Sequence, residues 1–208
     1  MGISMRMARL VALTAVSLLI ALALIARLGV WDALFPPSAP TFGASMVKPF
    51  TLTDQAGRKV TERDMLGRPA VVFFGFTYCP EVCPTTLADL TSWLGELGPD
   101  ADRLGIFFVT VDPARDTPSE LAKYLSSFDP RIRGLTGNAA DIDGIAKAFG
   151  IYYQRVEIEG GYTMDHSASV LLLDSDGRFA GTISYQESKA VAVAKLKRLA
   201  QRGAGPGA

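Results

Sequence analysis

The sequence predicts an α/β sandwich, in which helices cover both faces of a mixed β-sheet. Short apolar runs with strand character alternate with amphipathic helical segments between residues 49 and 202. Two of these runs, 69–76 and 105–112, are apolar along almost their whole length, which is typical of strands buried on both faces of a sheet. Residues 49–202 are therefore expected to form one folded domain.

The first half of this domain begins with a β-hairpin, followed by a strand and a helix. Residues 50–60 combine strand-forming residues with Gly57 in the expected turn. The buried strand over 69–76 leads to a helix over 84–98, whose leucines recur on one face. Pro84 suits the first helical position, because an N–H group there would have no helical partner.

The second half repeats this alternation and ends on a hairpin and a helix. A helix is expected over 117–128, where Thr117 and Glu120 form a capping box. The remaining elements are a strand at 131–137, a helix at 138–150, a strand at 152–158, a hairpin over 169–183 turning at Asp176 and Gly177, and a helix at 187–202. This closing order, with cysteines just after the first buried strand, predicts a thioredoxin-like sandwich. A Rossmann fold fits less well, because no G-x-G-x-x-G follows that strand.

The N-terminal segment differs in composition from the rest of the chain. Residues 10–26 are predominantly apolar and carry no charge, and extension to residue 34 predicts one transmembrane anchor over 10–34. Arg6 and Arg9 predict that residues 1–9 are cytoplasmic and that the folded domain lies across the membrane. A cleaved signal peptide is the alternative, but the apolar run is longer than usual and no convincing cleavage site follows it.

Composition also bounds the flanking segments and the partners. Residues 35–48 are rich in Pro, Ser, Ala and Gly and predict a linker, and residues 203–208 predict a disordered tail. The 21 basic and 21 acidic residues give a formal net charge of zero, and no basic stretch indicates nucleic-acid binding. An anchor and a signal peptide both export the domain, so its cysteines are expected to meet an oxidising compartment.

The two cysteines of the chain lie in one short stretch, TYCPEVCP, as Cys79 and Cys83. The pair is compatible with a structural disulfide, a redox-active disulfide or part of a metal site. A structural disulfide is the weakest of these, because closing so short a loop removes little chain entropy. The stretch follows a buried strand and precedes a helix, and a helix N-terminus stabilises the thiolate that redox chemistry and metal binding both need.

His166 is the only histidine, and it is expected in a polar loop just before the strand that begins near Ser169. In a thioredoxin-like fold this loop faces the cysteine turn. General oxidoreductases of this fold carry a cis-proline there, whereas this chain has no proline between Pro130 and Pro206. Two thiolates and one imidazole are one ligand fewer than structural zinc normally uses, whereas this soft set suits copper. We therefore expect one copper ion, with Met164 and Asp165 as weaker neighbouring candidates.

Three motifs, FGFTYCPEVCPTTL, FVTVDPARDTP and MDHSASVLLLD, together resemble the SCO/SenC family across residues 47–201. The resemblance implies a membrane-anchored, thioredoxin-like copper protein of cytochrome c oxidase assembly. It also implies that Cys79, Cys83 and His166 bind copper as Cu(I) or Cu(II), and that Asp112 lies near the site without binding the ion.

The resemblance implies a copper metallochaperone rather than an enzyme. Such a protein either delivers copper to the dinuclear site of oxidase subunit II or reduces the cysteines of that site. The implied partners are subunit II, other copper chaperones and a thioredoxin-like reductant, and the implied location is a bacterial inner membrane with the domain in the periplasm, or the intermembrane space. One alternative is a thiol–disulfide oxidoreductase or a peroxide-reducing antioxidant enzyme. A peroxidase needs an arginine near its reactive cysteine, and the sequence does not show whether Arg115 lies there. The other alternative is a redox or copper sensor at the membrane.

Overall fold

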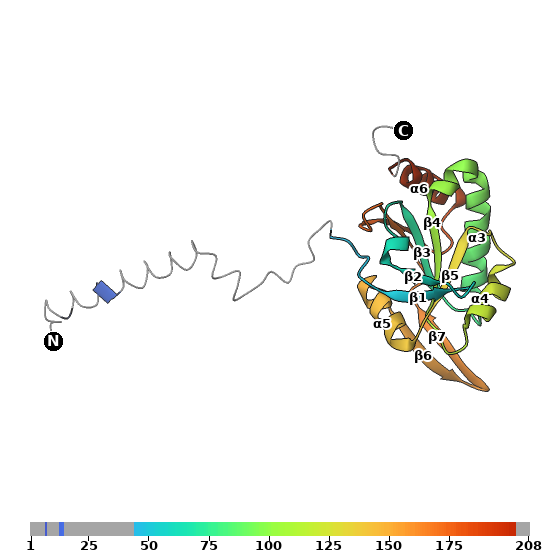
Figure 1. Ribbon diagram of the computed structural model, residues 1–208, viewed down its shortest axis with the longest axis horizontal. Coiled ribbons are helices and arrows are strands. Elements are labelled where there is room, and N and C mark those ends of the chain that lie inside the picture. Colours follow the sequence, from blue (N-terminus) through green and yellow to red (C-terminus); the bar gives the residue numbers. More distant parts are fainter. Residues whose placement is uncertain (1–6, 8–12, 15–43, 203–208) are drawn as a thin grey trace. The chain divides into compact units, whose positions relative to one another are not determined.

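The computed structural model describes residues 44–202, together with Met7, Leu13 and Thr14. A seven-stranded mixed sheet forms the centre of the domain (Figure 1). Its strands, in sheet order, are β2 (Lys59–Thr61), β1 (Thr51–Asp54), β5 (Ile132–Thr136), β4 (Gly105–Thr110), β3 (Ala70–Gly75), β8 (Val170–Leu173) and β9 (Phe179–Ile183). The predicted mixed α/β sheet is confirmed, as are the hairpins β1–β2 and β8–β9.

Strands β3 and β4 lie side by side in the interior of the sheet and run parallel. All six residues of each strand are buried. This matches the prediction from their continuous apolar sequence, because such strands lose water from both faces at once. Functional sites in sheets of this kind form where parallel strands end, and here the two strand ends are Gly75 and Thr110.

Helices cover both faces of this sheet (Figure 1). The four are α3 (Val82–Leu97), α4 (Pro118–Leu125), α5 (Ala139–Ala148) and α6 (Lys189–Arg202). The ring of Phe108 on β4 contacts Tyr124 on α4, whereas the ring of Phe74 on β3 contacts Phe149, which caps α5. Phe108 is paired with Phe73 across the two strands, and the neighbouring Phe74 points to the opposite face. Helices α4 and α5 therefore cover different faces. Short 3₁₀ helices at Glu62–Asp64 and Gly98–Arg103 complete the connections.

The start of α3 differs from its predicted position. The helix begins at Val82 rather than at Pro84, so Cys83 lies in its first turn and Pro84 is its third residue. Proline is tolerated there because the first four N–H groups of a helix have no partner inside it. At α4 the hydroxyl of Thr117 accepts a hydrogen bond from the N–H of Glu120, as the predicted N-cap requires.

A second, two-stranded sheet contains β6 (Tyr153–Ile158) and β7 (Gly161–His166), and it projects from the lower edge of the domain in Figure 1. The expectation that His166 lies in a loop is therefore wrong, because it ends β7 and pairs with Tyr153. The polar sequence of β7 lacks the apolar alternation of a half-buried strand. The available signal was the glycine pair at the hairpin end: Gly160 lies in the turn and Gly161 begins β7, both with positive φ, and glycine suits such tight turns.

Several predictions fall on residues that the structure does not describe. The cytoplasmic segment 1–9, the anchor 10–34, most of the linker 35–48 and the tail 203–208 lie almost wholly outside the described residues. Among the described residues, no helix combines the length and the apolar character needed to cross a membrane.

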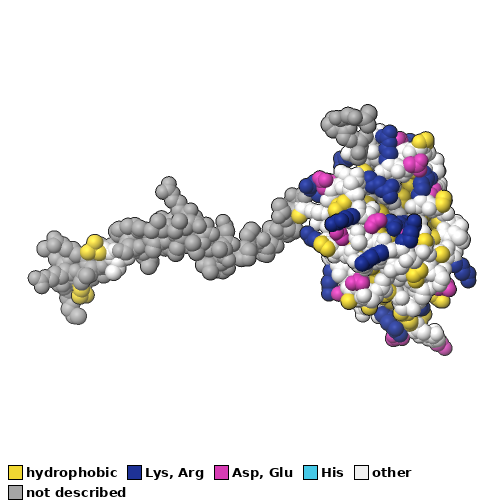
Figure 2. All heavy atoms as spheres, in the orientation of Figure 1, with side chains coloured by type: hydrophobic (Ala, Val, Ile, Leu, Met, Phe, Trp, Pro, Cys, Tyr) yellow, Lys and Arg dark blue, Asp and Glu magenta, His cyan; other side chains and the backbone are white. Residues whose placement is uncertain are grey.

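On the face of the domain seen in Figure 2, basic side chains lie among neutral and acidic ones.

Candidate metal centre

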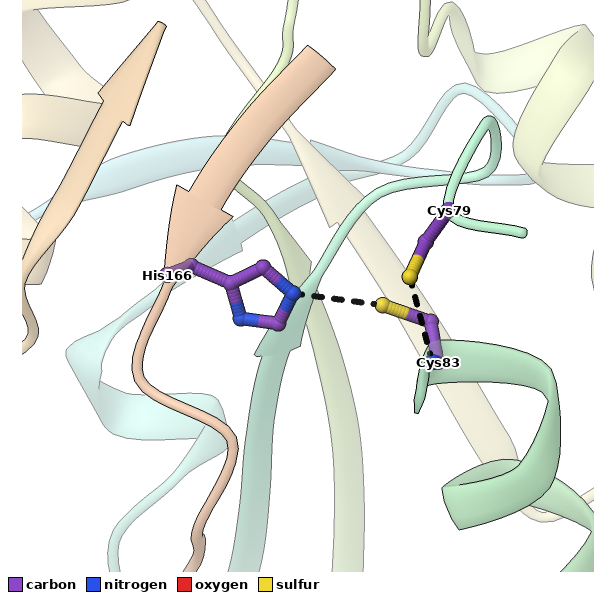
Figure 3. A group of neighbouring side chains, drawn as sticks. All are labelled: Cys79, Cys83 and His166. Carbon is purple, nitrogen blue, oxygen red and sulfur yellow. Dashed lines mark hydrogen bonds between the residues drawn. The ribbon is translucent and has the colours of Figure 1, made fainter. Parts of the chain in front are cut away.

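The two cysteines lie on either side of the start of α3 (Figure 3). Cys79 sits in the turn between β3 and α3 and is partly exposed, whereas Cys83 is fully buried. The backbone N–H of Cys83 donates to the sulfur of Cys79 at 3.4 Å. The sulfur thus interacts with one of the N–H groups that a helix start leaves without a helical partner. This position favours negative charge on Cys79.

The imidazole of His166 approaches the same sulfurs from β7 (Figure 3). Its Nε2 atom lies 3.4 Å from Sγ of Cys83, and its Nδ1 atom lies 2.9 Å from the carbonyl oxygen of Ser167. A proton on Nδ1 donates to that carbonyl and leaves the lone pair of Nε2 directed at the cysteines. The rings of Phe73 and Phe76 pack against the imidazole at centroid distances of 6.2 and 5.8 Å, which limits its rotation.

These three side chains form a compact set of donors. One ligand atom from each lies within 4.8 Å of the others, and this is the only group of three or more Cys, His, Asp or Glu side chains of that kind within the described part of the chain. Metal–sulfur bonds of about 2.3 Å and metal–nitrogen bonds of about 2.0 Å place ligand atoms at most roughly 4.6 Å apart. The donor set therefore fits a single metal ion after small side-chain movements.

The protonation of the two thiols is asymmetric. The adjacent side chain of Cys83, together with backbone N–H groups, lowers the pKa of Cys79 despite the opposing effect of burial. The neighbouring Cys79 and burial together raise the pKa of Cys83. These opposite pKa shifts favour a thiolate at the more accessible Cys79 over one at the buried Cys83. Both cysteines are free of disulfide bonds in this structure.

Gly75, which sequence reasoning did not identify, makes room for the buried sulfur. A Cβ atom at this position would lie 2.8 Å from Sγ of Cys83 and 2.8 Å from a ring carbon of Phe108. Both distances are far below ordinary contact. This constraint could not be predicted from the sequence, because it arises only when Cys83 at the start of α3 packs against the end of β3.

Asp116 is a second residue that sequence reasoning missed. Its carboxylate is fully buried and accepts hydrogen bonds from the hydroxyl and the N–H of Thr77, at 2.6 and 3.1 Å, and from the hydroxyl of Thr110 at 2.6 Å. Burial raises its pKa, and the threonine hydrogen bonds partly oppose this shift. Asp116 therefore ties the cysteine turn to the end of β4.

The predicted neighbours of the site lie in different environments. Asp112 is buried, forms an ion pair with Arg115 and accepts a hydrogen bond from the hydroxyl of Tyr162 at 3.0 Å. Asp165 is exposed on β7 and pairs with Gln154 of β6. The backbone at Asp165 is adjacent to His166, but successive side chains of a strand point to opposite faces.

The amino-acid sequence matches the family model described as SCO1/SenC over residues 38–201. The chain belongs to the SCO1/SenC family. The mitochondrial protein SCO2 of Saccharomyces cerevisiae is 36% identical to it over 158 residues, which cover 74% of this chain and 52% of the yeast protein. The chain thus spans about half the length of the curated relatives that it matches first.

Solved SCO structures share the fold of this domain. ScoI of Bradyrhizobium japonicum, with copper bound, superposes with a TM-score of 0.70 and 43% identity, covering 75% of this chain and 99% of that one. BsSco, described as a cytochrome c oxidase assembly protein with a disulfide switch, gives a TM-score of 0.61 and 25% identity, covering 78% of this chain and 96% of that one. The predicted thioredoxin-like α/β fold is confirmed. Unlike the general oxidoreductases of this fold, the described part of the chain contains no cis peptide bond.

Proposed function

We propose that this protein binds one copper ion through Cys79, Cys83 and His166 and acts in the assembly of cytochrome c oxidase. The observation that carries the proposal is the convergence of these three soft or borderline donors within 4.8 Å, in a member of a family that includes copper-bound ScoI. Sulfur and imidazole ligands favour copper over the hard cations. Three protein ligands also leave the ion accessible to an incoming ligand.

The exposure of the two cysteines suits transfer of the ion to another protein. Cys83 is buried while Cys79 is partly exposed, so an acceptor thiolate reaches the ion from the side of Cys79. Exchange of one protein ligand at a time keeps the ion bound to sulfur throughout. The proposed acceptor is the dinuclear copper site of oxidase subunit II, and other copper chaperones are the proposed donors.

Thiol reduction is a second role of the same residues, and the lowered pKa of Cys79 favours it. The Cys79 thiolate attacks a disulfide of the partner, and the Cys83 thiol then resolves the mixed disulfide after losing its proton. The partner gains two electrons and becomes a dithiol, while Cys79 and Cys83 form a disulfide. A thioredoxin-like dithiol then returns the pair to the reduced state. A general oxidoreductase or antioxidant enzyme, or a redox or copper sensor, would use the same pair with a different partner.

The proposal places the domain on the outer side of a membrane. The apolar segment 10–34, with Arg6 and Arg9 before it, supports a single-pass anchor whose N-terminus is cytoplasmic. In a bacterial cell the copper site would then lie in the periplasm. Copper insertion into the oxidase would, on this proposal, take place in that compartment. We expect the Pro-, Ser-, Ala- and Gly-rich segment 35–48 to serve as a linker between the anchor and the domain.

Replacement of His166 by alanine tests the metal site directly. In competition with a Cu(I) chelator, we expect His166→Ala to weaken copper binding by at least tenfold and to leave the far-UV circular dichroism unchanged. Gln154→Ala, on the exposed face of the same hairpin, is the matched control and should bind copper as the parent does. Retention of parental affinity by His166→Ala would contradict the three-ligand site.

The assembly role needs a separate measurement in cells. A strain that lacks this protein should contain oxidase subunit II with less than its normal copper content, and the parent gene should restore it while His166→Ala should not. Normal copper content in the deletion strain would exclude the assembly role but would leave copper binding intact.

A further inference from the structure

The hairpin that carries His166 is only lightly embedded in the domain. Of the twelve residues in β6 and β7, only Met164 is buried. A cavity of about 180 Å³ lies beneath the hairpin, lined by Val111, Ile142, Tyr153 and Met164 among others. Apolar packing alone therefore holds the hairpin weakly, and its position depends on the polar contacts that it makes.

Arg115 makes the principal polar contacts between the body of the domain and this hairpin. Its Nη1 donates to the carbonyl oxygen of Tyr162 at 3.0 Å, and its guanidinium lies 3.7 Å from the centre of the Tyr162 ring. The Nε of Arg115 donates to Asp112, which also accepts a hydrogen bond from the Tyr162 hydroxyl at 3.0 Å. Asp112 and Arg115 thus hold both the backbone and the ring of one β7 residue.

The same guanidinium also contacts the cysteine turn. It lies 4.6 Å from the centre of the Tyr78 ring, and Tyr78 immediately precedes Cys79. Tyr162 lies four residues before His166 on the same strand, which is about 13 Å of extended chain. Arg115 therefore joins the two segments that carry the three donor atoms.

We propose that Arg115 is a positioning residue, which holds the hairpin against the cysteine turn so that His166 completes the metal site. This inference rests on the proposed copper site and adds a residue that does not itself bind the ion. Arginine suits the task because its planar group stacks on aromatic rings while it donates hydrogen bonds at its edge. Lysine keeps the charge but loses the plane and most of these donors.

Arg155 offers a matched control on the same ring. Its guanidinium also lies 3.7 Å from the centre of the Tyr162 ring, but it is exposed and forms an ion pair with Glu157 on its own strand. Arg155 therefore stacks on Tyr162 without joining the hairpin to the body of the domain. If copper affinity depended only on an arginine stacked on the Tyr162 ring, replacing Arg115 or Arg155 by lysine would lower that affinity equally.

The test compares Cu(I) affinity in Arg115→Lys and Arg155→Lys. We expect Arg115→Lys to lose affinity by about tenfold to a hundredfold, the range found when groups that orient metal ligands are removed, and Arg155→Lys to stay within about threefold of the parent. Parental affinity in Arg115→Lys, or an equal loss in Arg155→Lys, would overturn the proposal.

A double-mutant cycle with His166→Ala separates positioning from simple stabilisation. The two remaining cysteines still offer soft ligands, so affinity can be measured against a weaker chelator. If Arg115 acts through His166, Arg115→Lys changes affinity by less than about threefold in the His166→Ala background. An equal loss with and without His166 would show that Arg115 acts only on the fold and would overturn the proposal.

A second variant keeps the proposal testable if Arg115→Lys does not fold. Tyr162→Leu removes the ring on which Arg115 stacks but leaves the ion pair between Arg115 and Asp112. It should lower Cu(I) affinity as Arg115→Lys does, and this loss should disappear in the His166→Ala background. No loss in this folded variant would overturn positioning. Failure of the copper site itself looks different, because His166→Ala alone would then match the parent.

Discussion

Gly75→Ala should damage the metal site by displacing Cys83, although it replaces none of the three proposed ligands. The added Cβ would lie 2.8 Å from Sγ of Cys83 and equally close to a ring carbon of Phe108. Ordinary contacts of this kind are about 3.5–4.0 Å long, so the neighbours must retreat by roughly 1 Å. Both side chains are fully buried, but Phe108 is held by ring contacts with Phe73 and Tyr124, so we expect the smaller side chain of Cys83 to move more.

Two magnitudes follow from this displacement. Overpacking of a well-filled core costs about 1–3 kcal/mol, and we expect the free energy of unfolding of the reduced, metal-free protein to fall by that amount. Metal–ligand distances tolerate errors of only about 0.2 Å, so a sulfur displaced by a larger distance binds poorly. We expect Cu(I) affinity to fall at least tenfold, as it does when ligand orientation is lost.

Urea unfolding and Cu(I) competition against a chromophoric chelator measure the two effects. Gly95→Ala is the control. Gly95 lies in α3, the helix that carries Cys83, and an added Cβ there meets no heavy atom within 4 Å. This control should gain about 0.5–1 kcal/mol from its better helix propensity and bind copper as the parent does. If Gly75→Ala kept parental stability and affinity, the close packing of Cys83 against β3 would be refuted.

Two further predictions concern the cysteine turn. Because the pKa of Cys79 is lowered, its thiolate persists as the pH falls below neutrality. Its rate of alkylation by iodoacetamide, measured by peptide mass mapping, should fall less than about threefold between pH 8 and pH 6, whereas an ordinary thiol of pKa about 8.5 slows roughly 70-fold. Asp116→Ala leaves the buried donors of Thr77 and Thr110 without their acceptor and should cost about 1–3 kcal/mol of unfolding free energy, whereas an unchanged urea midpoint would exclude this role.

The sequence was sufficient to predict most strands and helices of the domain, because their physical causes are local. The apolar run over 69–76 and the N-cap at Thr117 each reflect burial or hydrogen bonding that neighbouring residues determine. Strand β7 was missed because its polar residues pair with β6 at the edge of the domain rather than burying an apolar face. Its strand character comes from its backbone pairing with β6 and from the tight turn at Glu159 and Gly160.

The surroundings of the candidate site could not be predicted for a different reason. Thr77 and Asp116 are 39 residues apart in the chain, and Arg115 and Tyr162 are 47 apart. A single sequence carries no signal that such pairs meet. The type of donor could be read from Cys79, Cys83 and His166, but the residues that hold them in place could be found only once β3, β4 and the hairpin were placed together.

The turn after β4 explains why the three motifs of this chain belong together. Adjacent residues in that turn reach opposite parts of the site: Asp116 accepts hydrogen bonds from Thr77 beside the cysteines, and Arg115 stacks on Tyr162 in the strand that ends at His166. Thiols and imidazole come from segments with no backbone pairing between them, so a third segment is needed to set their separation. A change in this turn should therefore disturb copper binding even though no residue of the turn is a proposed ligand. The two residues hold segments of different kinds. Asp116 is buried and holds the cysteine turn through Thr77, whereas Arg115 holds the lightly embedded hairpin by stacking on Tyr162.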